Sequence, residues 1–153
     1  MIGRYAWVFF GAVGPIFVLF GLGDMASGGS TYDSGESVLF NAFTGTTWSA
    51  LQSADPGAAR LIAFGVRIGG VYFLLIGVLT LAISATAVRR GERCAWLVMW
   101  AFPLTIGVGL AILLFSPRLP DSGVPVPVIS GSIIIVLSLA VPVLSAPRYL
   151  RTS

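Results

Sequence analysis

The sequence predicts an all-α integral membrane protein, a bundle of four transmembrane helices in up-and-down order. Of its 153 residues, 56% are hydrophobic and 10% are charged, and the mean hydropathy is +0.94. A soluble domain carries about 25% charged residues, so lipid has to solvate much of this chain. Four apolar stretches lie near 5–22, 62–88, 95–115 and 124–144, and a bilayer core is crossed by roughly 20 helical residues. We expect one transmembrane domain over 1–153.

The first predicted span, 5–22, competes with a secretory signal peptide, because small residues follow it at 25–27. The span is long for a signal segment and rich in aromatic residues, so we expect it to remain as a helix of the mature protein. Gly11, Gly14 and Pro15 predict a close helix contact or a kink. The alternative is the ordinary glycine and proline content of membrane helices.

A loop over 24–55 separates the first two spans. Its first part, 24–37, is polar and rich in Gly and Ser, which is typical of an irregular surface segment. Its second part, 38–54, regains apolar residues but is too short to span, and we expect a re-entrant or interfacial segment there. Trp48 would anchor that segment at the head-group level. Thr47 is placed to cap a short helix that starts at Trp48.

The second span, 62–88, belongs to a helix that we expect to begin outside the membrane. Asp55-Pro56 is a helix-start signal, because Asp accepts the free N–H groups of a first turn and Pro at the first position loses no helical bond. The helix should stop at Arg89, and Gly91 should break it.

Glycine and proline predict contacts and bends in the spans. Gly65 and Gly69 have the spacing of small residues that lets two membrane helices approach closely. Pro103 predicts a kink in the third span, 95–115, because proline removes a helical hydrogen bond. A tight turn over 116–123 should then lead to the fourth span.

The basic residues predict the orientation in the membrane. All nine are arginines. On the side of both termini lie Arg4, Arg89, Arg90, Arg93, Arg148 and Arg151. Only Arg60 and Arg118 lie in the opposite loops. The positive-inside rule therefore predicts cytoplasmic termini and an external 24–55 loop, in the cell inner membrane. The residues expected to set orientation and to contact anionic lipid are Arg89, Arg90 and Arg93.

The composition removes much of enzyme chemistry. The chain has no His, which is the usual general base and the commonest metal ligand. Cys94 is the single Cys, so neither an internal disulfide nor a cysteine metal cluster can form. The spacing of the carboxylates matches no metal motif. We expect no catalytic residue, no metal and no cofactor, and the sequence favours a protein that is not an enzyme.

Arg67 is the candidate site residue, because it is the one charge within a predicted span. About 20 residues back from Arg89, it should lie near the outer boundary, where its side chain can reach water. It is then either an anchor paired with a loop carboxylate or part of an outward-facing cavity for an anionic head group or substrate. Arg60 should share its helix face, and Asp55 and Trp48 complete the candidate ligand site.

Several short strings carry a family resemblance. They are Thr44-Gly45-Thr46-Thr47-Trp48, Asp55-Pro56-Gly57, Arg67 with Gly70, and Arg90-Gly91-Glu92-Arg93-x-Ala95-Trp96. Together they resemble a pattern, over 44–103, of small uncharacterised bacterial four-helix membrane proteins. In size and topology the chain also resembles DoxX-like membrane proteins, which implies a quinone-linked function. Neither resemblance implies a catalytic residue.

Two functions remain open. The first is a non-catalytic polytopic membrane protein, an accessory or assembly subunit that packs against other membrane subunits or a second copy. The alternative is a lipid- or quinone-type small-molecule binding protein with an outer-leaflet site around Arg67. A pore or transporter ranks third, because the spans offer almost no polar lining. Membrane lipids are expected partners in each case, and nucleic acid is not, because the arginines follow the topology and form no phosphate-binding face.

Overall fold

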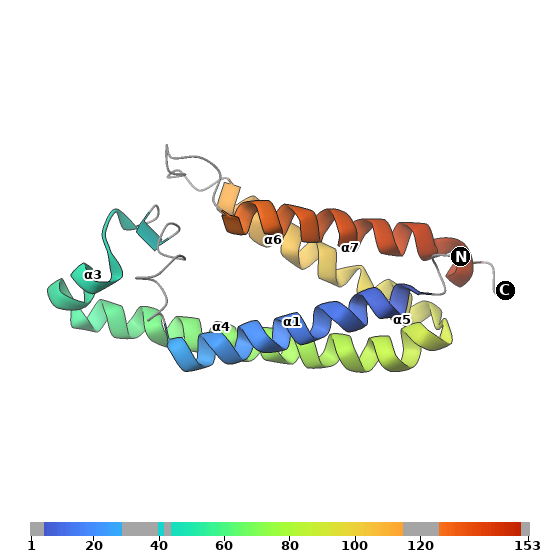
Figure 1. Cartoon of the computed structure of the whole chain (residues 1–153), viewed down its shortest axis with the longest axis horizontal. Helices are drawn as coiled ribbons and strands as arrows, with labels where there is room; N and C mark the ends of the chain where they lie inside the picture. Colours follow the sequence, from blue (N-terminus) through green and yellow to red (C-terminus); the bar gives the residue numbers. More distant parts are fainter. Residues whose placement is uncertain (1–4, 29–39, 42–43, 115–125, 151–153) are drawn as a thin grey trace. The chain divides into compact units, whose positions relative to one another are not determined.

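The structure is a computed structural model that describes residues 5–28, 40–41, 44–114 and 126–150. Regular secondary structure in this part of the chain is helical (Figure 1), and the all-α prediction is confirmed there. The elements are α1 (Ala6–Ser27), α3 (Trp48–Ala54), α4 (Pro56–Ile83), the π-helix η3 (Ser84–Val88), α5 (Arg93–Met99), α6 (Ala101–Leu114) and α7 (Val126–Leu150). The predicted turn at 116–123, together with Arg4, Arg118 and Arg151, lies outside the described residues.

Two of the described helices are long and apolar enough to cross a membrane, Ala6–Ser27 and Pro56–Val88. They coincide with the first two predicted spans. The described parts of the other two predicted spans contain shorter apolar helices, Arg93–Gly109 and Ser132–Pro147. By length and composition, the chain is therefore a possible membrane protein with two candidate spans.

The contacts divide the chain into two compact units. One contains Met1–Ile16, Gly77–Ser116 and Val126–Ser153, and the other contains Phe17–Ile76 and Pro117–Pro125. Helices α1 and α4 contribute residues to both units. The prediction of a single domain over 1–153 stays a prediction.

Glycines bring α1 and α4 into close contact. In the second unit, a Cβ atom built on Gly21 would lie 2.6 Å from the carbonyl oxygen of Gly70, closer than real Cβ atoms come. In the first unit, a Cβ atom on Gly14 would lie 3.0 Å from the carbonyl oxygen of Gly77. In both helices the two glycines are seven residues apart, so they share one face. The close contact predicted at Gly14 is confirmed.

The packing predicted at Gly65 and Gly69 involves no described helix of this chain. Within the described residues, a Cβ atom on either residue, or on Gly11, would meet nothing within 4 Å. The residues that face α1 lie instead on a different face of α4. The first glycine on that face is Gly70, one position after Gly69. Spacing alone identifies a pair of small residues but not the direction in which the pair points.

Gly91 ends the long α4–η3 helix, as predicted. Its φ is 84°, a left-handed conformation that favours glycine. Its N–H donates to the carbonyl of Val88 (3.1 Å), and the N–H of Glu92 donates to the carbonyl of Ala87 (3.0 Å). These two bonds form a Schellman motif, which satisfies carbonyls that a helix end leaves free.

The third predicted span is interrupted. Helix α5 ends at Met99, Trp100 forms a turn, and α6 starts at Ala101. Pro103 has no N–H to donate to the carbonyl of Met99, which accounts for the interruption one turn before it. The kink predicted from Pro103 stays a prediction. Helix α7 extends to Leu150 and is longer than the predicted 124–144 span.

Candidate functional site

Helix α3 is fixed over α4 by its first residue. The hydroxyl of Thr47 accepts a hydrogen bond from the N–H of Ala50 (3.2 Å), so the predicted cap is confirmed. The Trp48 side chain is only 2% exposed and packs with Ala59 and with the ring of Phe40, at 5.5 Å between centroids. The indole is therefore covered by protein and holds α3 against α4, in contrast to the exposed anchor expected from the sequence.

Asp55 starts α4. Its Oδ1 accepts hydrogen bonds from the N–H groups of Gly57 (3.0 Å) and Ala58 (2.9 Å). The helix begins at Pro56, as predicted. A carboxylate at this point also interacts favourably with the positive end of the helix. Asp55 is thus a capping residue, and it is not among the residues that line the pocket described next.

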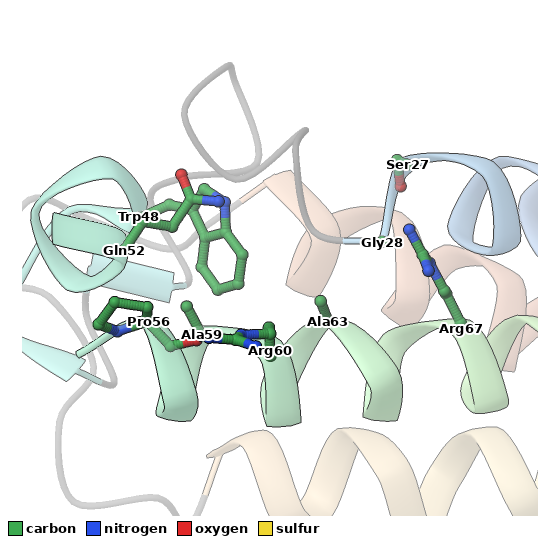
Figure 2. Close-up of a pocket in the computed structure, with 9 residues that line it drawn as sticks. All are labelled: Ser27, Gly28, Trp48, Gln52, Pro56, Ala59, Arg60, Ala63 and Arg67. Carbon is green, nitrogen blue, oxygen red and sulfur yellow. Dashed lines mark hydrogen bonds between the residues drawn. The ribbon is translucent and has the colours of Figure 1, made fainter.

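A pocket of about 330 Å³ lies in the second unit, between the end of α1, helix α3 and the first half of α4 (Figure 2). It is lined by Ser27, Gly28, Trp48, Gln52, Pro56, Ala59, Arg60, Ala63 and Arg67. Three of the four predicted ligand residues, Arg67, Arg60 and Trp48, therefore line one space.

The Arg67 side chain points from α4 toward the end of α1 (Figure 2). Gly28 ends α1 with a φ of +53°, and its N–H donates to the carbonyl of Asp24 (3.0 Å). A Cβ atom on Gly28 would lie 2.6 Å from Nε of Arg67. The guanidinium thus lies beside the negative end of the α1 dipole. Among the residues that the structure describes, none forms a hydrogen bond or ion pair with it.

Arg60 is held along its own helix. Its Nε donates to the carbonyl of Pro56 (3.2 Å), so the side chain runs back toward the start of α4. It lines the same pocket as Arg67, which confirms the prediction that the two share a face of the helix.

The lining of the pocket is basic. Its described lining residues supply two guanidinium groups, the Gln52 amide, the Ser27 hydroxyl and the Trp48 indole, and none of these described residues is a carboxylate. The Cβ atom of Asp24 lies against Gly70, 3.0 Å from the position that a Cβ atom built on Gly70 would take. Such a lining can neutralise an anion and cover an apolar group, but it offers no pair of nucleophile and general base. Within the described residues, no group of three or more His, Cys, Asp or Glu could hold a metal.

Sequence reasoning missed Gln52, Ser27 and Ala63 as lining residues. Ala63 had a usable signal, because it lies between Arg60 and Arg67 on the same face of one helix. Gln52 and Ser27 had none, since they reach the pocket from other helices.

The three predicted orientation residues lie in the first unit and differ in their contacts. The Arg89 guanidinium lies over the ring of Trp7, 5.2 Å from its centroid. Arg90 is exposed. Arg93 donates through Nε to the carbonyl of Tyr149 (2.9 Å) and through Nη2 to the carbonyl of Leu150 (3.2 Å). Arg93 therefore also caps the end of α7, a role that the sequence did not indicate.

The same end of α7 is held by two aromatic residues. The Tyr149 side chain is 0% exposed and its hydroxyl donates to the carbonyl of Val88 (3.0 Å). The Trp96 ring stacks on the Tyr149 ring at 6.0 Å, and its Nε1 donates to the carbonyl of Pro142 (3.1 Å). These contacts tie α7 to η3 and α5 and are structural.

Fold and pocket together define an all-α protein with two candidate membrane-crossing helices and a basic pocket beside one of them. No family model, no curated protein and no solved structure matches the chain. The resemblances to small bacterial four-helix membrane proteins and to DoxX-like proteins stay predictions.

Proposed function

We propose that the chain is a four-span protein of the cell inner membrane, with cytoplasmic termini and the pocket on the outer side. The length of the helix Pro56–Val88 supports this arrangement. Its 33 residues make a rod of about 50 Å, and the hydrocarbon core is about 30 Å thick. With Arg89 and Arg90 at the cytoplasmic surface, Arg67 falls near the outer boundary and the pocket falls among the lipid head groups.

The function that the geometry supports best is binding of a lipid- or quinone-type amphiphile around Arg67. The observation that carries this proposal is the convergence of Arg67, Arg60 and Trp48 on one pocket. Its volume, about 330 Å³, is near the lower end of ligand pockets and suits a head group better than a whole lipid. The apolar part of the ligand would remain in the bilayer beside α4.

Lipid retention tests the proposal. The full chain is purified from membranes in mild detergent, and the co-purified amphiphiles are quantified by native mass spectrometry. Arg67→Ala should lower the retained amount at least tenfold, because a charge-assisted hydrogen bond at such a site contributes about 1.5–3 kcal/mol. Arg90→Lys, which keeps the positive charge expected at the cytoplasmic surface, is the control and should retain the ligand. Equal retention by Arg67→Ala and the unmodified chain, with both inserted and folded, would refute the proposal.

An accessory subunit is the second candidate, and the open face of α4 favours it. Gly65 and Gly69 meet no described neighbour, and the large side chains around them, including Leu61 and Phe64, are exposed. A face of this kind lets a helix of another subunit, or of a second copy, approach closely. Gly69→Leu should then reduce crosslinking to a partner or between copies in native membranes. Unchanged crosslinking would count against this candidate.

A further inference from the structure

The two arginines of the pocket contact different parts of the second unit. Their Cα atoms are seven residues apart on one helix, a separation of about 10 Å. Arg60 is turned back toward the start of α4 by its bond to the carbonyl of Pro56. Arg67 is directed to the end of α1, with Nε, Cζ and Nη2 within 3.2 Å of the Cβ position of Gly28. The guanidinium groups thus lie toward opposite ends of the pocket.

The space between them is lined by small and uncharged groups. Ala63 lies between the two arginines along α4, and its methyl group faces the pocket (Figure 2). From α3, the Trp48 ring and the Gln52 side chain line the opposite side. A short neutral linker fits this middle section, because the described residues between the two arginines carry no charge.

One small anion would use only one of the two guanidinium groups. With Arg60 bonded to the carbonyl of Pro56 and Arg67 beside Gly28, a single phosphate on Arg67 would leave the Arg60 guanidinium unused. Each guanidinium presents a planar fork of N–H donors that matches one phosphate or carboxylate. A quinone carries no charge and would neutralise neither arginine. A ligand with two acidic groups would therefore use both forks.

On the basis of the proposed function, we propose that the ligand is an amphiphile with a diacidic head group. One acidic group binds Arg67 and the other binds Arg60, and the linker between them passes over Ala63. The lipid source, as opposed to a soluble diacid, follows from the position of the pocket at one end of a helix that is long and apolar enough to span a membrane. The head group enters the pocket, and the acyl chains stay in the bilayer.

The test compares probes that differ in the number of phosphates. The full chain is titrated in detergent micelles with phosphatidylcholine, phosphatidylglycerol (one phosphate without a counter-charge), diphosphatidylglycerol (two phosphates joined by glycerol), ubiquinone and soluble glycerol 1,3-bisphosphate. Native mass spectrometry counts the bound molecules. We expect diphosphatidylglycerol to bind at least tenfold more tightly than phosphatidylglycerol, and the soluble bisphosphate to compete weakly.

Variants assign this preference to the two arginines. Arg60→Ala and Arg67→Ala should each reduce the binding of diphosphatidylglycerol to the level of phosphatidylglycerol, and Arg90→Lys, which keeps the positive charge at that position, should keep the tenfold preference. Ala63→Leu keeps every charge but fills the path of the linker. It should abolish the preference for two phosphates while phosphatidylglycerol still binds.

The outcomes separate this inference from the function on which it rests. If both phospholipids bind equally and Arg67→Ala weakens both, or if ubiquinone binds best and depends on Arg67, the pocket binds an amphiphile but the diacidic head group is wrong. If no probe binds more tightly than phosphatidylcholine and Arg67→Ala changes nothing, the proposed function fails as well. Strong competition by the soluble bisphosphate would overturn the lipid source.

Discussion

The Arg67 side chain lies against the backbone of Gly28, at a point where a Cβ atom would be 2.6 Å from its Nε. Apart from this contact, the φ of +53° at Gly28 disfavours every residue type other than glycine at this position. The position of the guanidinium thus depends on a glycine on another helix, and a change at Gly28 should alter the pocket without removing a charge.

Gly28→Ala tests this dependence. The left-handed backbone should cost about 1–3 kcal/mol of stability, and the displaced guanidinium should weaken amphiphile binding severalfold. Gly45→Ala is the matched control, because Gly45 has a φ of +71° and open space around its Cβ position. It should lose stability but keep binding, as measured by thermal unfolding and native mass spectrometry. Equal binding by the two variants would show that Gly28 does not position Arg67.

Tyr149→Phe should destabilise the first unit. The hydroxyl is buried and donates to the carbonyl of Val88, and its removal leaves a buried acceptor without its partner, at about 1–3 kcal/mol. Thermal unfolding in detergent measures the change. Tyr5→Phe, at a side chain that is 64% exposed, should unfold at the temperature of the unmodified chain. A melting temperature for Tyr149→Phe as high as that of Tyr5→Phe would contradict the bond.

Gly21→Ala should destabilise the contact between α1 and α4 in the second unit. A Cβ atom there would lie 2.5 Å from the backbone nitrogen of Leu74, and backbone atoms cannot turn aside. We expect a loss of about 1–3 kcal/mol. Gly23→Ala, on the same helix with nothing within 4 Å, should be neutral or stabilising, because Ala favours helix by up to about 1 kcal/mol. The reverse order of stability would exclude this packing.

Arg93→Lys should separate capping from orientation. Lys keeps the positive charge that the topology requires but has no planar fork to reach the carbonyls of Tyr149 and Leu150 together. The expected loss is about 1–2 kcal/mol of stability with the topology unchanged. Arg90→Lys, at an exposed side chain, should change neither the stability nor the topology. An equal loss of stability in Arg93→Lys and Arg90→Lys would argue against capping of α7 by Arg93.

Cysteine labelling tests the orientation. Cys94 is exposed at the start of α5 and should be protected in intact cells from a membrane-impermeant maleimide, because we expect it on the cytoplasmic side. In a Cys94→Ser background, Ser49→Cys at an exposed position of α3 should react rapidly. Labelling of Cys94 but not of Ser49→Cys would invert the proposed topology.

Local rules explain what could be predicted from the sequence. The cap at Thr47, the helix start at Asp55-Pro56 and the helix stop at Gly91 each depend on a few neighbouring residues, and the structure confirms all three. The shared face of Arg60 and Arg67 also follows from one helix alone. Helical character and apolar length likewise sufficed for the all-α class and for the two candidate spans.

The rest depends on contacts between distant segments. The glycines that meet α1 are Gly70 and Gly77 rather than Gly65 and Gly69, and only the partner helix decides between the two sets. Arg93 and Tyr149 are 56 positions apart, so no local pattern links them. Asp55 looked like a ligand beside Arg60, but the N–H groups of its own helix occupy its carboxylate oxygen.

The π-helix Ser84–Val88 bears on which changes in chain length this protein can accept. A π turn holds more residues than an α turn, and each residue of an α-helix advances the chain by about 100° around its axis. The wide turn therefore sets the direction in which Val88 and Arg89 face around the helix axis. The carbonyl of Val88 accepts a hydrogen bond from the Tyr149 hydroxyl, and the Arg89 guanidinium lies over the ring of Trp7. Because the wide turn accommodates one extra residue, deleting one residue within Ser84–Val88 would restore α-helical winding and leave the residues on either side facing nearly the same directions. A single-residue deletion there should therefore be tolerated better than a deletion elsewhere in the same helix.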